Sequence, residues 1–175
     1  QTAGIPLKLY GSNYIDGERY IDNKMNIYKY FLPGAKTLGD ILFENGYRNY
    51  FFLGTAAEYA GKKDYLKQHG HYKIIDKYEI NSIKNRDKKT RVYDKEVFEI
   101  VKEQLPKISK NQQPFSLLIQ TFDTHFGNVN SFQTVSLQTV DFYNWLKKQS
   151  FFKDTVILIV GDHCNMNQID FVNIE

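Results

Sequence analysis

The chain has 175 residues, of which 42% are hydrophobic and 15% aromatic, and its formal net charge is +3. This length and composition predict one folded domain with a substantial core and exclude a disordered chain, while the small net charge gives no argument for nucleic-acid binding. The single cysteine, Cys164, excludes an internal disulfide framework, and no apolar run approaches the ~20 residues needed to cross a bilayer.

Residues 1–35 predict a loop-rich lead-in, because glycines and prolines interrupt this stretch repeatedly. The first helix is expected after Thr37, a good N-cap residue with Asp40 three positions later. Asn45-Gly46 is expected to end it. Its inward face is predicted to be apolar, made of Leu38, Ile41 and Leu42.

An alternation of strands and helices follows. Residues 50–53 (YFFL) and 72–76 (YKIID) predict short buried strands, and residues 58–69 between them have a helical, basic pattern. Residues 84–91 (KNRDKKTR) are locally basic, and a solvated loop explains them better than a binding surface does. Strands that alternate with helices are typical of an α/β fold with a parallel sheet.

The second half continues this alternation. A helix is predicted over 94–105, with Pro106 just beyond its end, and a buried strand over 115–122. A longer helix is predicted over 132–148, whose inward residues are expected to be Val135, Phe142, Tyr143 and Leu146.

The most apolar stretch lies near the end of the chain, at residues 155–160 (TVILIV). A run without polar alternation is typical of a strand covered on both faces. Asp162 and His163 follow directly, where an open α/β sheet places its functional groups, and together they suit Zn²⁺ or Mn²⁺. The alternative is that Asp162 caps a turn and His163 lies on the surface. The αβ core is thus expected to span 36–163, with a polar tail at 164–175.

Two of the predicted buried strands end in turns that carry a histidine. These are FSLLIQTFDTH, which ends at His125, and TVILIVGDH, which ends at His163. Neighbouring parallel strands would bring both turns to the same edge of the sheet, so the pair suggests a metal site there. A Rossmann nucleotide binder is disfavoured because no glycine-rich phosphate loop follows a strand.

Six segments, in this order, resemble the sulfatase branch of the alkaline phosphatase superfamily. They are GIPL, TLGDILFENGYRNYFFLG, AGKKDYLKQHG, VYDKEVFEIVKEQL, PFSLLIQTFDTH and FKDTVILIVGDH. Within that branch, the chain most resembles the bacterial phosphoglycerol transferases related to lipoteichoic acid synthase. The resemblance implies a three-layer α/β/α sandwich, incomplete at both ends of this chain.

The resemblance also implies a reaction and roles for four residues. It implies transfer of glycerol phosphate from a membrane phospholipid to a periplasmic glycan by a threonine nucleophile. Asp162 and His163 match metal ligands, with Mn²⁺ the expected ion and Zn²⁺ or Mg²⁺ the alternatives. His125 matches a histidine that contacts the substrate and takes part in catalysis. Lys62 matches a substrate-facing arginine, and the alternative for Lys62 is a solvated helix lysine.

The chain departs from the family pattern at its start. The threonine nucleophile and the remaining metal ligands are expected upstream of GIPL, and Thr2 is too close to that segment to be the nucleophile. The expected enzyme is anchored at the periplasmic face of the bacterial inner membrane by a segment upstream of this chain. The alternatives are a sulfatase or phosphoethanolamine transferase and, in another class, a catalytically inactive truncated relative.

Overall fold

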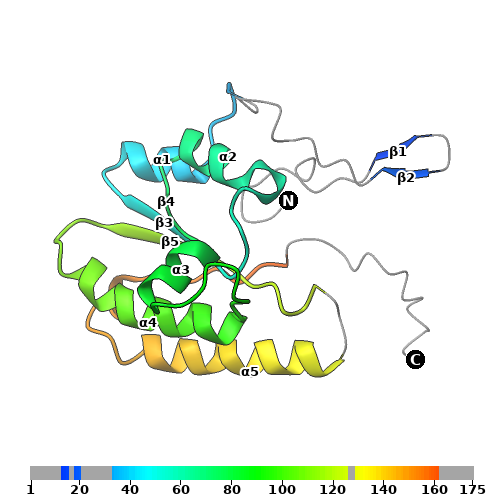
Figure 1. Cartoon of the computed structure of the whole chain (residues 1–175). Helices are drawn as coiled ribbons and strands as arrows, with labels where there is room; N and C mark the ends of the chain where they lie inside the picture. The colour runs from blue at the N-terminus through cyan, green and yellow to red at the C-terminus, as the bar shows by residue number, and fades with distance from the viewer. Residues whose placement is uncertain (1–12, 16–17, 21–32, 126–128, 162–175) are drawn as a thin grey trace, which may run out of the picture.

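The computed structural model describes residues 13–15, 18–20, 33–125 and 129–161 (Figure 1). Its centre is a three-stranded sheet in the order β4-β3-β5, made of β4 (Lys73–Ile75), β3 (Arg48–Leu53) and β5 (Phe115–Gln120). Both neighbours run parallel to β3. The predicted parallel sheet is therefore confirmed, and its carboxyl ends meet at one edge.

The central strand β3 is buried on both faces, as its continuous apolar sequence predicts. Tyr50 and Phe52 pack into a core on one face, whereas Phe51 and Leu53 pack into a second core on the other. Phe51 and Phe52 are both 0% exposed. This division follows from the two-residue period of a strand, which sends neighbouring side chains to opposite faces.

Helices cover both faces, which confirms the three-layer α/β/α arrangement. In Figure 1, α1 (Leu38–Glu44) and α2 (Lys62–Gln68) lie above the sheet. Below it lie α3 (Lys77–Ile83) and α4 (Asp94–Ser109), with α5 (Val129–Leu146) beyond α4. Phe98 of α4 and Phe142 of α5 join these two helices, with ring centroids 5.2 Å apart.

Helix α1 has the predicted ends but contacts the domain through an unexpected residue. Thr37 and Asp40 form the predicted capping box, and the C-cap is Asn45. The predicted inward face is wrong at two of its three residues, however, because Leu38 is 54% and Ile41 44% exposed, whereas Leu42 is half-buried. The helix instead packs through Gly39, whose missing side chain lets the backbone approach Gly70 closely.

Two further helix predictions need correction. Helix α4 does not stop before Pro106 but includes it. The proline falls in the last turn, where only the end of the hydrogen-bond ladder is affected. Tyr143 of α5 is 41% exposed although it was predicted to point inward, whereas Val135, Phe142 and Leu146 are buried as expected.

The predicted buried strand at residues 155–160 is wrong for this structure. The run has no regular secondary structure and pairs with none of the described strands. Its side chains are largely exposed, with Val156 at 86% and Ile159 at 75%. The run was expected to join the sheet, but among the described strands β5 pairs only with β3. Residues 155–160 therefore gain neither hydrogen bonds to a neighbouring strand nor burial under a layer of helices.

The predicted lead-in is described only in part. It contains a short antiparallel pair, β1 (Asn13–Ile15) and β2 (Glu18–Tyr20), where no regular structure was predicted. The predicted tail at 164–175 lies outside the described residues. Of the helices in the described ranges, none is long and apolar enough to span a membrane.

Candidate functional site

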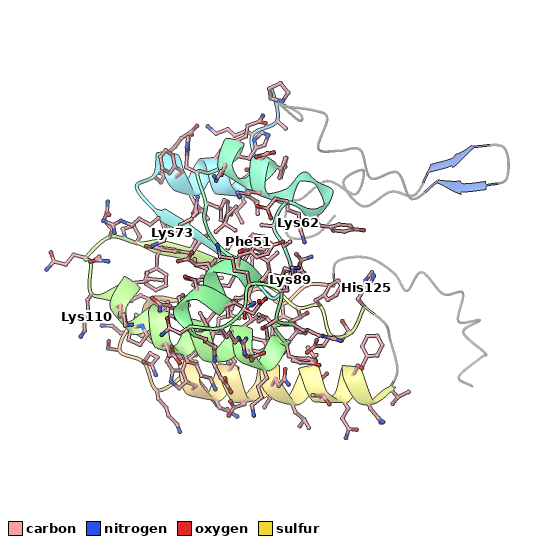
Figure 2. The ribbon with its side chains drawn as sticks, in the orientation of Figure 1. Phe51, Lys62, Lys73, Lys89, Lys110 and His125 are labelled. Carbon is pink, nitrogen blue, oxygen red and sulfur yellow. The ribbon has the colours of Figure 1, made fainter. Side chains whose placement is uncertain are left out.

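The candidate site lies where β3 and β5 end. Gly54 and Thr55 follow β3 directly, and Gln120 is the last residue of β5, paired in register with Leu53. The carboxyl edge of a parallel sheet is where α/β folds place their functional groups. Figure 2 shows Lys62 and His125 on this side of the domain.

Lys62 is buried at this edge with its ammonium group between the two strands. It is the first residue of α2 and follows a 3₁₀ helix (Tyr59–Gly61), with Gly61 at φ +68° making the bend. Lys62 is only 3% exposed. Its Nζ donates to Gln120 Oε1 at 3.2 Å and lies 3.5 Å from Thr55 Oγ1. The interpretation of Lys62 as a solvated helix lysine is therefore wrong.

The surroundings of Lys62 are polar but hold no neutralising carboxylate. Among the described residues, no Asp or Glu oxygen lies within 4.0 Å of its Nζ. Burial lowers the pKa of Lys62 to about 8, and the more distant charge of Asp76 raises it only in part. Both Asp76 oxygens already accept backbone N–H bonds, one from Ala57 and the other from the first turn of α3. Lys62 is thus a buried cation whose direct partners are neutral, an arrangement that favours binding of an anion.

A second buried charge fixes the turn that carries His125. Asp94, the first residue of α4, is 1% exposed. Its carboxylate accepts N–H bonds from Phe122 (2.8 and 3.0 Å) and Asp123 (2.9 Å). In return, the Asp94 N–H donates to Asp123 Oδ2 at 2.9 Å. These reciprocal bonds tie the start of α4 to the turn after β5.

The electrostatics of Asp94 are dominated by its burial. Burial raises the pKa of Asp94 to about 6, although the N–H bonds from Asp123 and Phe122 act in the opposite direction. Asp123 is a like charge nearby, and its own ion-pair partner is Arg91, at 3.4 Å. Asp94 is therefore ionised at neutral pH and is held by backbone donors.

His125 projects from this turn toward solvent. Its N–H donates to the Phe122 carbonyl at 2.9 Å, which closes the turn, and its ring stacks on the Phe122 ring at a centroid distance of 4.9 Å. The side chain is exposed. A core role for His125 is thereby excluded, and the imidazole is accessible to a ligand at the carboxyl edge of the sheet.

Four residues that were not predicted as site residues also shape this site, namely Thr55, Asp94, Gln120 and Asp123. One signal was available for Gln120, because it is a polar residue that ends an otherwise apolar strand. Asp94 reads in sequence as an ordinary acidic residue in the first turn of a helix. Its link to the turn at 122–125 is a tertiary contact with no local sequence signal.

The predicted metal ligands Asp162 and His163 lie outside the described residues, so their meeting with the His125 turn stays a prediction. Within the described ranges, no group of three or more His, Cys, Asp or Glu side chains is placed to hold a metal ion.

The chain matches the sequence model of the sulfatase family over residues 13–144. It is also similar to proteins named phosphoglycerol transferase I from Salmonella typhi and Escherichia coli (strain 55989 / EAEC). Each is 34% identical over 162 residues, which cover 78% of this chain and 21% of the relative. The chain thus spans about a fifth of the length of these relatives.

A similar fold occurs in a solved structure. The crystal structure of a protein in the alkaline phosphatase superfamily from Vibrio parahaemolyticus aligns with a TM-score of 0.53 and 20% sequence identity. The alignment covers 66% of this chain and 32% of that one. This likeness concerns the fold, and it confirms the predicted alkaline phosphatase-like α/β architecture.

Proposed function

The chain belongs to the sulfatase family, and from this membership we propose that it forms part of the catalytic domain of a phosphoglycerol transferase. The relatives with that name support this reaction class. The proposed reaction moves glycerol phosphate from a membrane phospholipid to a periplasmic glycan. The proposed location is the periplasmic face of the bacterial inner membrane, through an anchor upstream of this chain.

The observation that carries the proposal is the buried ammonium of Lys62. Its hydrogen-bond partners are the neutral groups of Thr55 and Gln120. A phosphate oxygen would supply the missing negative charge, and a charge-assisted bond of this kind is about twice as strong as a neutral one. We assign Lys62 to the phosphate of the substrate.

His125 is assigned a second role at the same edge of the sheet. Its exposed imidazole can donate a hydrogen bond or a proton to a phosphate oxygen or to the leaving oxygen. Asp94 contributes by holding the backbone of the turn from which His125 projects. The nucleophile is proposed to be a threonine upstream of this chain.

The proposed cofactor is a divalent cation, with Mn²⁺ first and Zn²⁺ or Mg²⁺ as alternatives, held in part by Asp162 and His163. A bound cation supplies Lewis-acid stabilisation of phosphoryl oxygens. Two ligands make only part of a binding site, so this chain is expected to bind Mn²⁺ weakly in calorimetry. Tight stoichiometric binding that survives Asp162→Ala would contradict this assignment.

The function is tested in a protein that joins this chain to the N-terminal region of its longer relatives. Transfer of glycerol phosphate from phosphatidylglycerol to a glucan acceptor is measured for the parent, Lys62→Met and His125→Ala. We expect each variant to lose roughly 10²-fold in turnover, with metal content and thermal stability retained. Lys63→Met is the matched control for Lys62, because Lys63 is only half-buried and pairs with Glu58.

Two outcomes would refute the proposal. The first is a parent protein that is folded and metal-loaded but releases sulfate from sulfate esters faster than it transfers glycerol phosphate. The second is a Lys62→Met variant whose turnover equals that of the Lys63→Met control.

A further inference from the structure

The basic loop, residues 84–91, leads into the carboxyl edge of the sheet beside the candidate site. The residue that follows it, Val92, packs against the end of β3, where a Cβ at Gly54 would lie 2.7 Å from the Val92 carbonyl oxygen. Arg91 reaches the turn after β5, and its Nη2 lies 3.4 Å from Asp123 Oδ1. The end of the loop is therefore attached to both of the strands that bear the site.

A buried amide holds the loop in one shape. Asn81 of α3 is 0% exposed, and its Nδ2 donates to the carbonyl oxygens of Lys88 (3.3 Å) and Thr90 (2.9 Å). Its Oδ1 accepts from Arg86 Nε at 2.6 Å. These bonds turn backbone carbonyl groups inward, while the side chains of Lys88 and Lys89 are exposed. The loop therefore presents its positive charge on a fixed backbone, which reduces the entropy lost on binding.

The exposed charge of residues 84–96 is mainly positive. The exposed cations, which we call the basic surface, are Lys88, Lys89, Arg91 and Lys95. Among the described residues, no carboxylate lies within 4.0 Å of the ammonium groups of its three lysines. Of the acidic residues in this segment, Asp94 is buried and Glu96 pairs with Arg86 at 2.6 Å, which leaves Asp87 as the exposed one. The basic surface is therefore open to an external polyanion.

An aromatic side chain accompanies these cations. Tyr93 is 49% exposed, and the guanidinium carbon of Arg91 lies 4.4 Å from its ring centroid. Tyrosine is enriched where proteins meet the membrane–water boundary, because its ring is apolar and its hydroxyl group is polar. Figure 2 shows Lys89 on the same side of the domain as Lys62 and His125. The basic surface and the candidate site therefore face the same way.

We propose that the basic surface docks the domain on anionic phospholipid headgroups, with the carboxyl edge of the sheet toward the membrane. The choice of a lipid surface rests on the proposed function, because that reaction takes its donor from a membrane phospholipid. Anionic lipids give a membrane a negative surface potential, which attracts clustered lysines and arginines. The basic surface would contact the lipids that surround the donor, whereas Lys62 would contact the phosphate of the donor itself.

The test measures partition of the folded chain onto lipid vesicles by sedimentation. The vesicles contain phosphatidylcholine alone or phosphatidylcholine mixed with phosphatidylglycerol. We expect binding to the mixed vesicles at low salt and release as salt is raised, because salt screens the attraction between exposed charges. The neutral vesicles measure any binding through the exposed apolar side chains of residues 155–160, and we expect that binding to be much weaker.

Two triple variants separate the basic surface from general charge attraction. Lys88→Gln/Lys89→Gln/Lys95→Gln should weaken binding to the mixed vesicles roughly 10²-fold, because each basic residue near an anionic surface contributes about fivefold.

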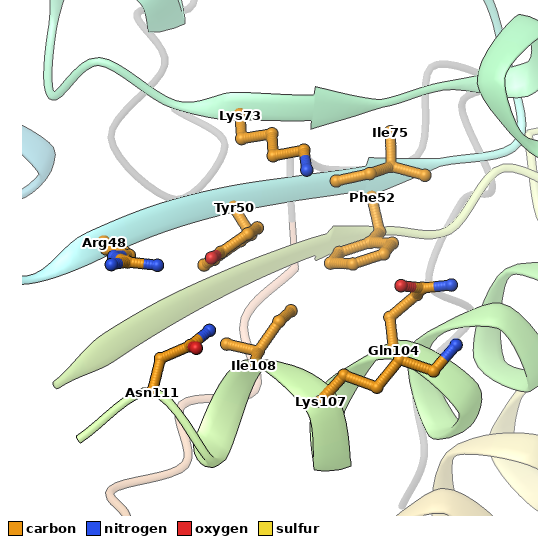
Figure 3. A pocket seen from close by; sticks show the side chains of 9 residues that line it. All are labelled: Arg48, Tyr50, Phe52, Lys73, Ile75, Gln104, Lys107, Ile108 and Asn111. Atoms are coloured by element: carbon orange, nitrogen blue, oxygen red, sulfur yellow. The ribbon is translucent and has the colours of Figure 1, made fainter. Parts of the chain in front are cut away.

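The control, Lys73→Gln/Lys107→Gln/Lys110→Gln, removes the same charge from exposed positions and should leave vesicle binding unchanged. Figure 2 shows Lys73 and Lys110 on the side of the domain away from His125. Lys73 and Lys107 line a hollow between β4 and the end of α4 (Figure 3). Circular dichroism checks that both triple variants are folded.

Three results would overturn the inference. Equal binding to neutral and mixed vesicles would mean that apolar contacts bring the chain to the membrane. Equal weakening by the two triple variants would mean attraction without a defined surface. Binding to heparin, but not to the mixed vesicles, that is lost in the Lys88/Lys89/Lys95 variant would assign the surface to a polyanionic chain.

The docking surface and the proposed reaction can fail separately. Vesicle binding is measured without turnover, so its absence would refute the docking surface alone. Equal turnover of Lys62→Met and Lys63→Met would refute the proposed role of Lys62, whatever the vesicles show.

Discussion

At the residue scale, the two buried charges at the carboxyl edge have different tasks. Lys62 has neutral hydrogen-bond partners, Thr55 and Gln120, and no carboxylate among the described residues pairs with it. Asp94 has its carboxylate occupied by backbone N–H groups and acts on the shape of the turn. The charge of Lys62 is the one that we propose recognises a ligand, whereas the charge of Asp94 holds the backbone of the turn.

The pKa of Lys62 gives a prediction about stability. Burial lowers this pKa from 10.5 to about 8, so between these values the unfolded chain holds more protons than the folded chain. The free energy of unfolding should therefore rise as pH increases from about 8 toward 10.5. Urea denaturation across this range should show the rise in the wild type, and a smaller rise in Lys62→Met. Equal slopes for the two proteins would mean that Lys62 titrates normally.

Asp94 predicts a different pH dependence. In Asp94→Ala, the N–H groups of Phe122 and Asp123 lose their acceptor, which should lower the free energy of unfolding by about 1–3 kcal/mol. Burial raises the pKa of Asp94 from 3.8 to about 6. Its stabilising contribution is then largest below pH 3.8 and falls as pH rises through about 6.

The difference between wild type and Asp94→Ala should therefore shrink over that range in urea denaturation. Amide hydrogen exchange at Phe122 and Asp123 should accelerate in the variant. Asp87→Ala is the control, because Asp87 is exposed and accepts a bond within its own loop. Unchanged exchange at both amides in Asp94→Ala would show that the turn does not depend on this carboxylate.

At the element scale, the attachment of α1 depends on the absence of side chains. Asn49 of β3 donates from Nδ2 to the carbonyls of Gly39 (2.9 Å) and Gly70 (2.7 Å). These bonds join α1, β3 and the loop before β4 at one point. A β-carbon at either glycine would meet atoms of the neighbouring segment at 2.6 Å. The three segments therefore fit together only with glycine at both positions.

Gly70→Ala is expected to be strongly destabilising. The backbone φ of Gly70 is +94°, and a Cβ there would lie 2.6 Å from the Gly39 carbonyl carbon. Strain alone is worth about 1–3 kcal/mol, and the contact adds to it. Gly46→Ala is the matched control, because φ is +83° but nothing lies within 4 Å of its Cβ. Urea midpoints should show a clearly larger loss for Gly70→Ala, and equal losses would mean that α1 can move aside without penalty.

Whether a feature could be predicted depends on how far apart its interacting residues lie in the sequence. The cap at Thr37 and Asp40 was predictable because its partners are three residues apart. The strand around Phe51 and Phe52 was predictable from its continuous apolar run. The docking of α1 through Gly39 and the burial of Lys62 depend on segments distant in sequence, and no local pattern reports them.

At the scale of the whole molecule, the stable core and the most apolar sequence do not coincide. The core is built around β3 and α4, where Ile100 and Val101 are 0% exposed. The run at residues 155–160 has greater apolar density, yet Leu158 is 73% exposed. Sequence alone overestimates the burial of this run. Apolar residues are usually buried, but the sequence does not show which part of the protein would cover them.

A pair of identical substitutions measures this contrast. Leu105→Ala removes a side chain that is 2% exposed and should lower the free energy of unfolding by about 2–5 kcal/mol. Leu158→Ala removes one that is 73% exposed and should change it by less than about 0.5 kcal/mol. Chemical denaturation of both variants provides the measurement. A loss at Leu158 equal to that at Leu105 would show that the run is covered in solution.

The strand order also determines when this sheet can be completed during synthesis. The central strand pairs with β4 and with β5, whose residues Phe115–Gln120 emerge much later than its own. At about 5–20 residues per second, a ribosome needs roughly 2–9 seconds to extend the chain from Ile75 to Gln120. During those seconds one edge of β3 lacks its strand partner, and an unpaired apolar edge is prone to association with other chains. We therefore expect the nascent chain to be most prone to such association in the interval between the synthesis of β4 and that of β5.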